Sequence, residues 1–210
     1  MIAAFDDIMK EVMRNNHNRG FSVIELIVAL GIFGIIMGVV LFNYGSSGDS
    51  LAVSASGQEL SVAIRQAQVY GLSVKESSSG SGQFSYAYGV FVSPSSAPSD
   101  YLIFVDKNNN RIYDVGAGSC GTLTTECVEK QSFRNGIRIS SIEDGSGSMP
   151  SGAVAVSITF LRPNPDAVVK FTNGSGGVVS TGTKAKVNLI SPRGKIYSVT
   201  VSSNGQILAQ

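Results

Sequence analysis

The feature that most constrains this chain is a long apolar stretch near its N-terminus, which runs from Phe21 to Phe42. Ser22 and Glu25 are its only clearly polar residues. At about 1.5 Å per helical residue the stretch forms a helix of roughly 33 Å, enough to cross the hydrocarbon core of a bilayer. Placing a carboxylate inside a membrane-spanning helix costs free energy, so Glu25 is expected to have a charged partner or a function. We predict a membrane-spanning helix over residues 21–42; the alternative for Glu25 is an incidental acid in a signal-anchor.

The residues around the start of this stretch form a recognisable motif, Gly20-Phe21-Ser22-Val23-Ile24-Glu25-Leu26. It resembles the class III signal of type IV prepilins and type II secretion pseudopilins. In that family a membrane aspartic peptidase cuts after the glycine and methylates the new N-terminal residue. The resemblance implies cleavage between Gly20 and Phe21 and N-methylation of Phe21. It also implies that Glu25 pairs with the terminal amine of a neighbouring subunit during assembly.

Residues 1–20 are then a cleaved leader. Acidic residues are unusual just ahead of an insertion signal, which leads to the hypothesis that translation starts at Met13. Arg14 and Arg19 place the N-terminus in the cytoplasm and the remainder outside. We expect a single-pass protein of the inner, cytoplasmic membrane that enters an extracytoplasmic or cell-surface filament after processing.

The polar run at 43–50 is expected to interrupt the helix, and within the region 43–76 an amphipathic helix that continues into the head is expected from Leu51 to about Glu76. Apolar residues recur there at helical spacing, which predicts a face that packs on a globular domain. Two sets follow from this spacing. The apolar face comprises Val53, Leu60, Ala63, Ile64, Ala67, Tyr70 and Val74, and the side facing water or neighbouring subunits comprises Gln58, Glu59, Arg65, Gln66 and Gln68.

Residues 77–210 have the pattern of a strand-rich head with Gly- and Ser-rich turns. Strands are predicted at 84–92, 101–105, 127–133, 136–142, 153–161, 168–171, 184–191, 195–201 and 206–209, with tight turns at Asn135-Gly136 and Asn204-Gly205. The fold class is therefore α+β, a long N-terminal helix packed on an antiparallel β-sheet head. This order resembles the lollipop shape of pilins, and in particular the GspH/FimT-like minor pilins and pseudopilins. Major pilins usually carry a proline near the end of the membrane helix, where this chain has Phe42 and Asn43.

Cys120 and Cys127 are the two cysteines of the chain. If the head is exported, as the signal implies, a disulfide between them is expected.

The loop after the strand at 101–105 carries oxygen-bearing groups at alternate positions: Asp106, Asn108, Asn110, the Ile112 carbonyl and Asp114. This spacing is similar to that of a calcium loop, although it supplies fewer oxygens than calcium prefers and lacks the usual glycine and glutamate. The alternative is a tight turn in which the Asp and Asn side chains bond the local backbone. No other cofactor is expected.

We do not expect an enzyme, because the only histidine, His17, lies in the leader and the mature chain therefore has no Ser-His-Asp set. A DNA-uptake role is a weaker alternative. Basic residues outnumber acids after residue 160, but the Gly-Arg-x-Arg tail of DNA-binding relatives is replaced by Gly205-Gln206-Ile207-Leu208, so a nucleic-acid partner is not expected.

These observations predict a minor pilin or pseudopilin. Its expected partners are other pilin subunits, contacted through the N-terminal helix, the prepilin peptidase, and the inner membrane before assembly. The alternative from another class is a non-polymerising, membrane-anchored extracytoplasmic binding domain.

Overall fold

The computed structural model describes residues 20–210 except 74, 78–79, 115, 117–118 and 123, and it describes no side chains for 42–47. The chain divides into two units, Met1–Gly45 and Ser46–Gln210. The expectations for Met13, Arg14, His17, Arg19 and Val74 lie outside the described residues.

The described part of the first unit is the beginning of helix α2 (Val23–Leu72). Its stretch Val23–Leu41 is long and apolar enough to cross a membrane, and none of it is buried within the protein. The predicted interruption at residues 43–50 is wrong, because helical backbone continues through these residues. Glycine and serine cost only about 0.5–1 kcal/mol each in a helix, which the strongly helical residues on both sides can offset.

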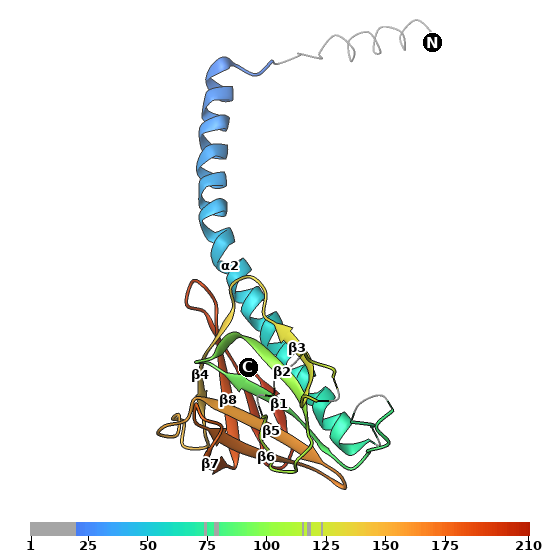
Figure 1. The fold of residues 1–210 in the computed structure, drawn as a ribbon. Helices are drawn as coiled ribbons and strands as arrows, with labels where there is room; N and C mark the ends of the chain where they lie inside the picture. The colour runs from blue at the N-terminus through green and yellow to red at the C-terminus, as the bar shows by residue number, and fades with distance from the viewer. Residues whose placement is uncertain (1–19, 74, 78–79, 115, 117–118, 123) are drawn as a thin grey trace, which may run out of the picture. The chain divides into compact units, whose positions relative to one another are not determined.

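The second unit is a head in which the rest of α2 packs on β-strands (Figure 1). Their bounds are β1 (Ala87–Ser93), β2 (Ala97–Asp106), β3 (Cys127–Ser132), β4 (Arg138–Glu143), β5 (Ala155–Leu161), β6 (Asn164–Thr172), β7 (Val178–Gly182), β8 (Lys184–Ile190), β9 (Ile196–Ser202) and β10 (Ile207–Ala209). The architecture is α+β and pilin-like, as the sequence predicts.

The strands form two antiparallel sheets. The first has the order β3-β2-β1-β5-β6-β7 and the second the order β10-β9-β8-β4. In the first sheet, Val90 of β1 pairs with Ile103 of β2 and with Ile158 of β5, so three buried strands form its centre. The chain passes from one sheet to the other between β3 and β4, between β4 and β5, and again at Thr183 between β7 and β8.

The predicted apolar face of α2 is the face that enters the core. Val53, Leu60, Ala63, Ile64 and Ala67 are at most 5% exposed and belong to one cluster with buried residues of both sheets.

The polar side of α2 differs from expectation at one position. Gln68 is half-buried, and its Nε2 donates to the Pro165 carbonyl at 3.1 Å and to the Gly205 carbonyl at 3.2 Å. The helix ends at Leu72, before the predicted boundary at residue 76.

Two glycines allow α2 to lie directly on the strands. A Cβ atom on Gly57 would lie 2.1 Å from the ring of Tyr197 on β9, and one on Gly71 would lie 2.4 Å from the Phe160 carbonyl oxygen on β5. The Gly71 carbonyl also accepts a hydrogen bond from the Arg162 amide at 3.0 Å. These contacts hold this part of α2 on both sheets.

Candidate functional site

The first candidate site is the junction at which the chain enters α2. Gly20 and Phe21 precede the helix, and Phe21 is 88% exposed. A Cβ atom placed on Gly20 would meet no atom within 4 Å. The Gly20–Phe21 peptide bond therefore lies before the helix, between two exposed residues.

Ser22 and Glu25 form a capping box at the start of α2. The Ser22 hydroxyl accepts a hydrogen bond from the Glu25 amide at 3.3 Å, and Glu25 Oε2 accepts one from the Ser22 amide at 3.1 Å. This reciprocal pair satisfies two backbone donors that a helix N-terminus otherwise leaves without partners. The Ser-x-x-Glu spacing was visible in the sequence, so this role of Glu25 could have been predicted from it.

The apolar side chains that follow are exposed all around this part of α2. They include Ile24, Leu26, Ile27, Leu30, Phe33, Ile35, Ile36 and Leu41, each more than half exposed. Gly31, Gly34 and Gly38 have no atom within 4 Å of a would-be Cβ atom. Such a surface is stable in lipid or against other apolar helices, and its glycines permit close helix–helix approach.

The second candidate site is the loop that follows β2, where the predicted calcium residues lie. Asp106 is fully buried, and its two carboxylate oxygens accept hydrogen bonds from the amides of Asn110 (3.0 Å) and Arg111 (2.9 Å). The Arg111 guanidinium lies 3.8 Å from the same carboxylate. Asn109 and Arg111 adopt positive φ angles of 61° and 64°, which bend the backbone around Asp106.

The other predicted ligands also bond within the loop. Asn108 Oδ1 accepts from the Asn110 amide at 3.1 Å, and Asn110 Oδ1 accepts from the Ile112 amide at 2.9 Å. Asp114 Oδ2 accepts from the side-chain amides of Asn108 (2.5 Å) and Asn110 (2.8 Å). The structure therefore brings Asp106, Asn108, Asn110 and Asp114 into one loop, but their oxygens receive N–H donors in the manner of a tight turn. Among the described residues, no group of three or more His, Cys, Asp or Glu side chains is placed to hold a metal ion.

Glu126 also bonds to this loop, although no pattern in the sequence indicates it. Its side chain is buried and accepts hydrogen bonds from the amides of Lys107 (3.0 Å) and Asp114 (2.9 Å). Burial raises the pKa of the Glu126 carboxyl, and the nearby charges of Asp114 and Asp106 raise it further, while the two amide donors lower it. The sequence held no periodic signal for this residue, because it lies at the irregular entry to β3.

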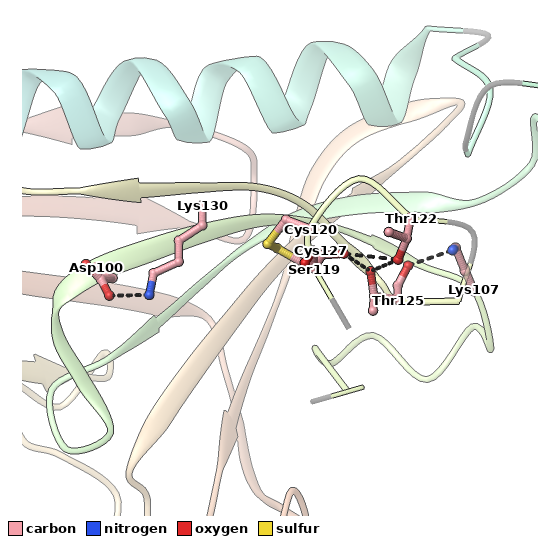
Figure 2. The surroundings of a disulfide bond; sticks show 8 residues. All are labelled: Asp100, Lys107, Ser119, Cys120, Thr122, Thr125, Cys127 and Lys130. Carbon is pink, nitrogen blue, oxygen red and sulfur yellow. Dashed lines mark hydrogen bonds and ion pairs between the residues drawn. A yellow bond between two sulfur atoms is a disulfide. The ribbon is translucent and has the colours of Figure 1, made fainter. Parts of the chain in front are cut away.

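A disulfide closes the segment that leads into β3 (Figure 2). The bond joins Cys120 to the buried Cys127, and the Gly121 amide donates to the Cys127 carbonyl at 2.7 Å. Lys107 Nζ donates to the Thr125 carbonyl at 2.6 Å, so the β2 loop and the disulfide segment are joined. This is the pair of cysteines expected from the sequence, and its place in the structure is that of a structural cross-link.

A hollow of about 170 Å³ lies beside this disulfide. It is lined by Lys75, Glu76, Thr122, Thr125, Cys127 and neighbouring residues. Typical small-molecule sites occupy about 300–1,000 Å³, so this hollow is small for a ligand.

The basic residues after position 160 do not all lie on one surface. Lys170 on β6 donates to the Asn110 carbonyl at 2.7 Å, while Lys186 on β8 pairs with Glu143 at 3.2 Å. They therefore lie on different sheets and serve local contacts.

Comparisons with known proteins give one match. The family described as the prokaryotic N-terminal methylation motif matches residues 15–41, which include Gly20, Phe21 and Glu25. No curated protein and no solved structure matches the chain.

Proposed function

Because this chain carries the type IV prepilin-like N-terminal signature, we propose that it is a structural subunit of a type IV pilus or a type II secretion pseudopilus. The observation that carries this proposal is the methylation motif at residues 15–41, on a helix whose apolar side chains are exposed. The residues at the end of the apolar stretch, Phe42 and Asn43 in place of a proline, favour a minor subunit.

Processing is the first step of this proposal. A prepilin peptidase cuts between Gly20 and Phe21 and methylates the amine of Phe21. The exposed backbone at this position and the open space around Gly20 support the assignment. Glycine is suited to it because it lets the backbone enter a cleft without a side-chain clash.

Assembly is the second step. Cleavage leaves a cationic amine at the head of an apolar helix, and such a charge in lipid needs a counter-ion. Glu25 supplies this counter-ion to the Phe21 amine of a neighbouring subunit. In the uncleaved chain the Glu25 carboxylate bonds the Ser22 amide, so it remains satisfied before a partner arrives.

The location follows from these steps. Before assembly the chain resides in the inner membrane as a single-pass protein with its leader in the cytoplasm. After processing it enters an extracytoplasmic filament. No catalytic role is proposed.

A test of assembly compares Glu25→Ala with the matched control Glu59→Ala in the cells that encode the chain. Glu59 is an exposed glutamate of α2 within the head unit. Quantitative immunoblots of sheared filaments and membranes should show both variants cleaved, with Glu25→Ala depleted at least several-fold from the filament fraction.

The control variant should distribute like the unaltered chain. If the unaltered chain is absent from filaments and stays in the membrane, the non-polymerising anchored domain is the better description. If Glu25→Ala assembles normally, the counter-ion role of Glu25 is wrong.

A further inference from the structure

One end of the head unit gathers basic side chains from two separate loops. We name the set Arg134, Arg138, Arg193 and Lys195 the basic rim; all four residues are exposed. The loop between β3 and β4 carries the first arginine, the start of β4 carries the second, and the β8–β9 turn carries the last two.

Several contacts bring these loops together. A Cβ atom on Gly136 would lie 3.0 Å from Cγ of Pro192, so the β3–β4 loop touches the β8–β9 turn. Arg138 pairs with Ile190 at the end of the β4–β8 ladder. The Lys195 amide donates to the Ser191 hydroxyl at 3.0 Å.

The same turn is fastened to α2. Asp49 Oδ2 accepts hydrogen bonds from the Ser191 hydroxyl at 2.6 Å and from the Arg193 amide at 3.1 Å. The β8–β9 turn of the basic rim therefore lies beside the first residues that α2 contributes to the head.

The balance of charge here is positive. The rim contributes four cations, whereas Asp49 is a single carboxylate bonded to this turn, where the charges of Arg193 and Lys195 act on it. In the part of the chain that the structure describes, Arg134, Arg138 and Lys195 have no ion-pair partner within 4 Å. An anionic partner could therefore approach these three side chains directly.

Exposed apolar side chains accompany the cations. Leu51, two residues after Asp49, is 71% exposed, and Ile196, next to Lys195, is 63% exposed. The backbone of a nucleic acid provides phosphates, but it provides no apolar layer into which an aliphatic side chain could insert. Anionic lipid offers both a charged headgroup layer and an acyl boundary, which suits cations flanked by aliphatic groups.

The covalent chain also limits how far this surface can be from a membrane. Only residues 42–48 lie between Leu41, the end of the apolar stretch, and Asp49. Fully extended they reach about 25 Å, and as a helix about 10 Å, so the headgroups of a bilayer that holds the stretch are within reach.

We propose that the basic rim, with Leu51 and Ile196, binds the anionic phospholipid headgroups of the membrane in which the apolar stretch of α2 is inserted. The inference rests on the proposed membrane-anchored precursor, and it adds a contact that the head must break to enter a filament. Anionic lipid content then controls how much of the subunit is held at the membrane.

The test uses the full chain, which contains no tryptophan, so that one introduced indole reports alone. Ile196→Trp places the probe in the rim, and Met149→Trp is the control, because Met149 is exposed in the loop after the opposite end of β4. Each protein is placed in nanodiscs of phosphatidylcholine with brominated acyl chains, with or without added phosphatidylglycerol, and indole quenching is measured.

We expect phosphatidylglycerol to increase quenching of the Ile196→Trp protein at least twofold and to leave the Met149→Trp protein unchanged. The increase should disappear at about 1 M salt, where the Debye length is about 3 Å. Adding Arg134→Glu and Lys195→Glu should also abolish it, whereas Arg65→Glu and Lys184→Glu, which change the net charge equally at exposed sites away from the rim, should not.

Equal quenching with and without phosphatidylglycerol would overturn the lipid proposal while leaving the subunit assignment intact, because the chain is then still inserted. Failure of the chain to enter nanodiscs would overturn the membrane-anchored precursor and this inference with it. If Arg134→Glu and Lys195→Glu abolish binding to a random DNA duplex but leave lipid quenching unchanged, the rim is a nucleic-acid surface and the proposal is wrong. The effect of salt is measured on the Ile196→Trp protein without charge reversals. The proposal can therefore be tested even if the variant with Arg134→Glu and Lys195→Glu does not fold.

Discussion

At the scale of single residues, buried carboxylates determine the conformation of the loop that follows β2. Asp106 accepts two backbone N–H groups, and its loop bends around it through two residues with positive φ. Glu126 supports the same loop by accepting hydrogen bonds from two further amides. The loop geometry is therefore produced by acceptors placed where the backbone has donors to satisfy.

Asp106→Asn should destabilise the head by about 1–3 kcal/mol, because an amide NH₂ then faces one of the two backbone N–H groups. Urea unfolding followed by circular dichroism measures the loss. Asp166→Asn, an exposed aspartate on β6, should change the free energy of unfolding by less than about 0.5 kcal/mol.

Thermal melts with and without calcium decide between the turn and the calcium loop. If the loop oxygens serve the backbone, calcium should leave the melting temperature of the unaltered chain unchanged. A calcium-dependent rise that Asp106→Asn abolishes would contradict the turn and restore the metal.

The Asp49 contact predicts how stability responds to acid. The hydrogen bond from Ser191 is the main reason that the pKa of Asp49 lies below its ordinary value of 3.8. A lowered pKa means that the folded state favours the ionised carboxylate. The stabilisation is present above the ordinary pKa and is lost as the pH falls below about 3.8 toward the folded value.

Asp49→Asn should therefore lower the free energy of unfolding at pH 7 and have a smaller effect near pH 3. Urea unfolding at the two pH values measures the difference. An effect of the same size at both pH values would show that the contact does not depend on charge.

At the scale of elements, α2 is positioned by the absence of side chains at two points. Gly57 and Gly71 let it approach β9 and β5, respectively, so close that no Cβ atom fits without movement. The periodic apolar residues then fill the space between the helix and the two sheets. Both features are needed, since periodicity selects the face and the glycines set its distance.

Gly71→Ala should destabilise the head by about 1–3 kcal/mol, because the added methyl group would lie against the Phe160 carbonyl, which is fixed in β5. Gly48→Ala provides a matched control on the same helix, where a Cβ atom meets nothing within 4 Å. This control should be neutral or stabilising by up to about 1 kcal/mol, since alanine is the better helix former. Equal effects of the two substitutions in thermal melts would show that close packing at Gly71 is not the cause.

The elements also show what could be predicted from the sequence. Val53, Leu60 and Ala67 were predictable as core residues, because helical periodicity depends only on local spacing. Strand β7 was missed, because its Gly- and Ser-rich surroundings are typical of a turn. Its extended conformation is stabilised by pairing with β6, which the local sequence does not indicate. The division into two sheets was also missed, because each crossing between the sheets depends on pairing with strands distant in the sequence.

The candidate sites divide in the same way. The Gly20–Phe21 junction and Glu25 come from a contiguous motif, so sequence alone predicts them. Glu126 and the basic rim depend on residues that the fold brings together, such as Gly136 and Pro192, and no local spacing indicates them.

At the scale of the whole molecule, two units have different requirements. The head buries its own core and has a disulfide, whereas the apolar stretch of α2 has no burial within the protein. The second unit can therefore be stable by itself, while the first needs lipid or other helices. This division is what a subunit needs if it must be held in a membrane and then packed into a filament.

The central claim is that the chain is a precursor with a site for peptidase processing at Gly20. The most direct measurement is intact and N-terminal peptide mass spectrometry of the full chain after co-expression with a prepilin peptidase. The account predicts a product that begins at Phe21 and carries one added methyl group, and it predicts that Gly20→Val prevents cleavage. A chain that keeps residues preceding Phe21 while a control prepilin in the same cells is processed would contradict the account.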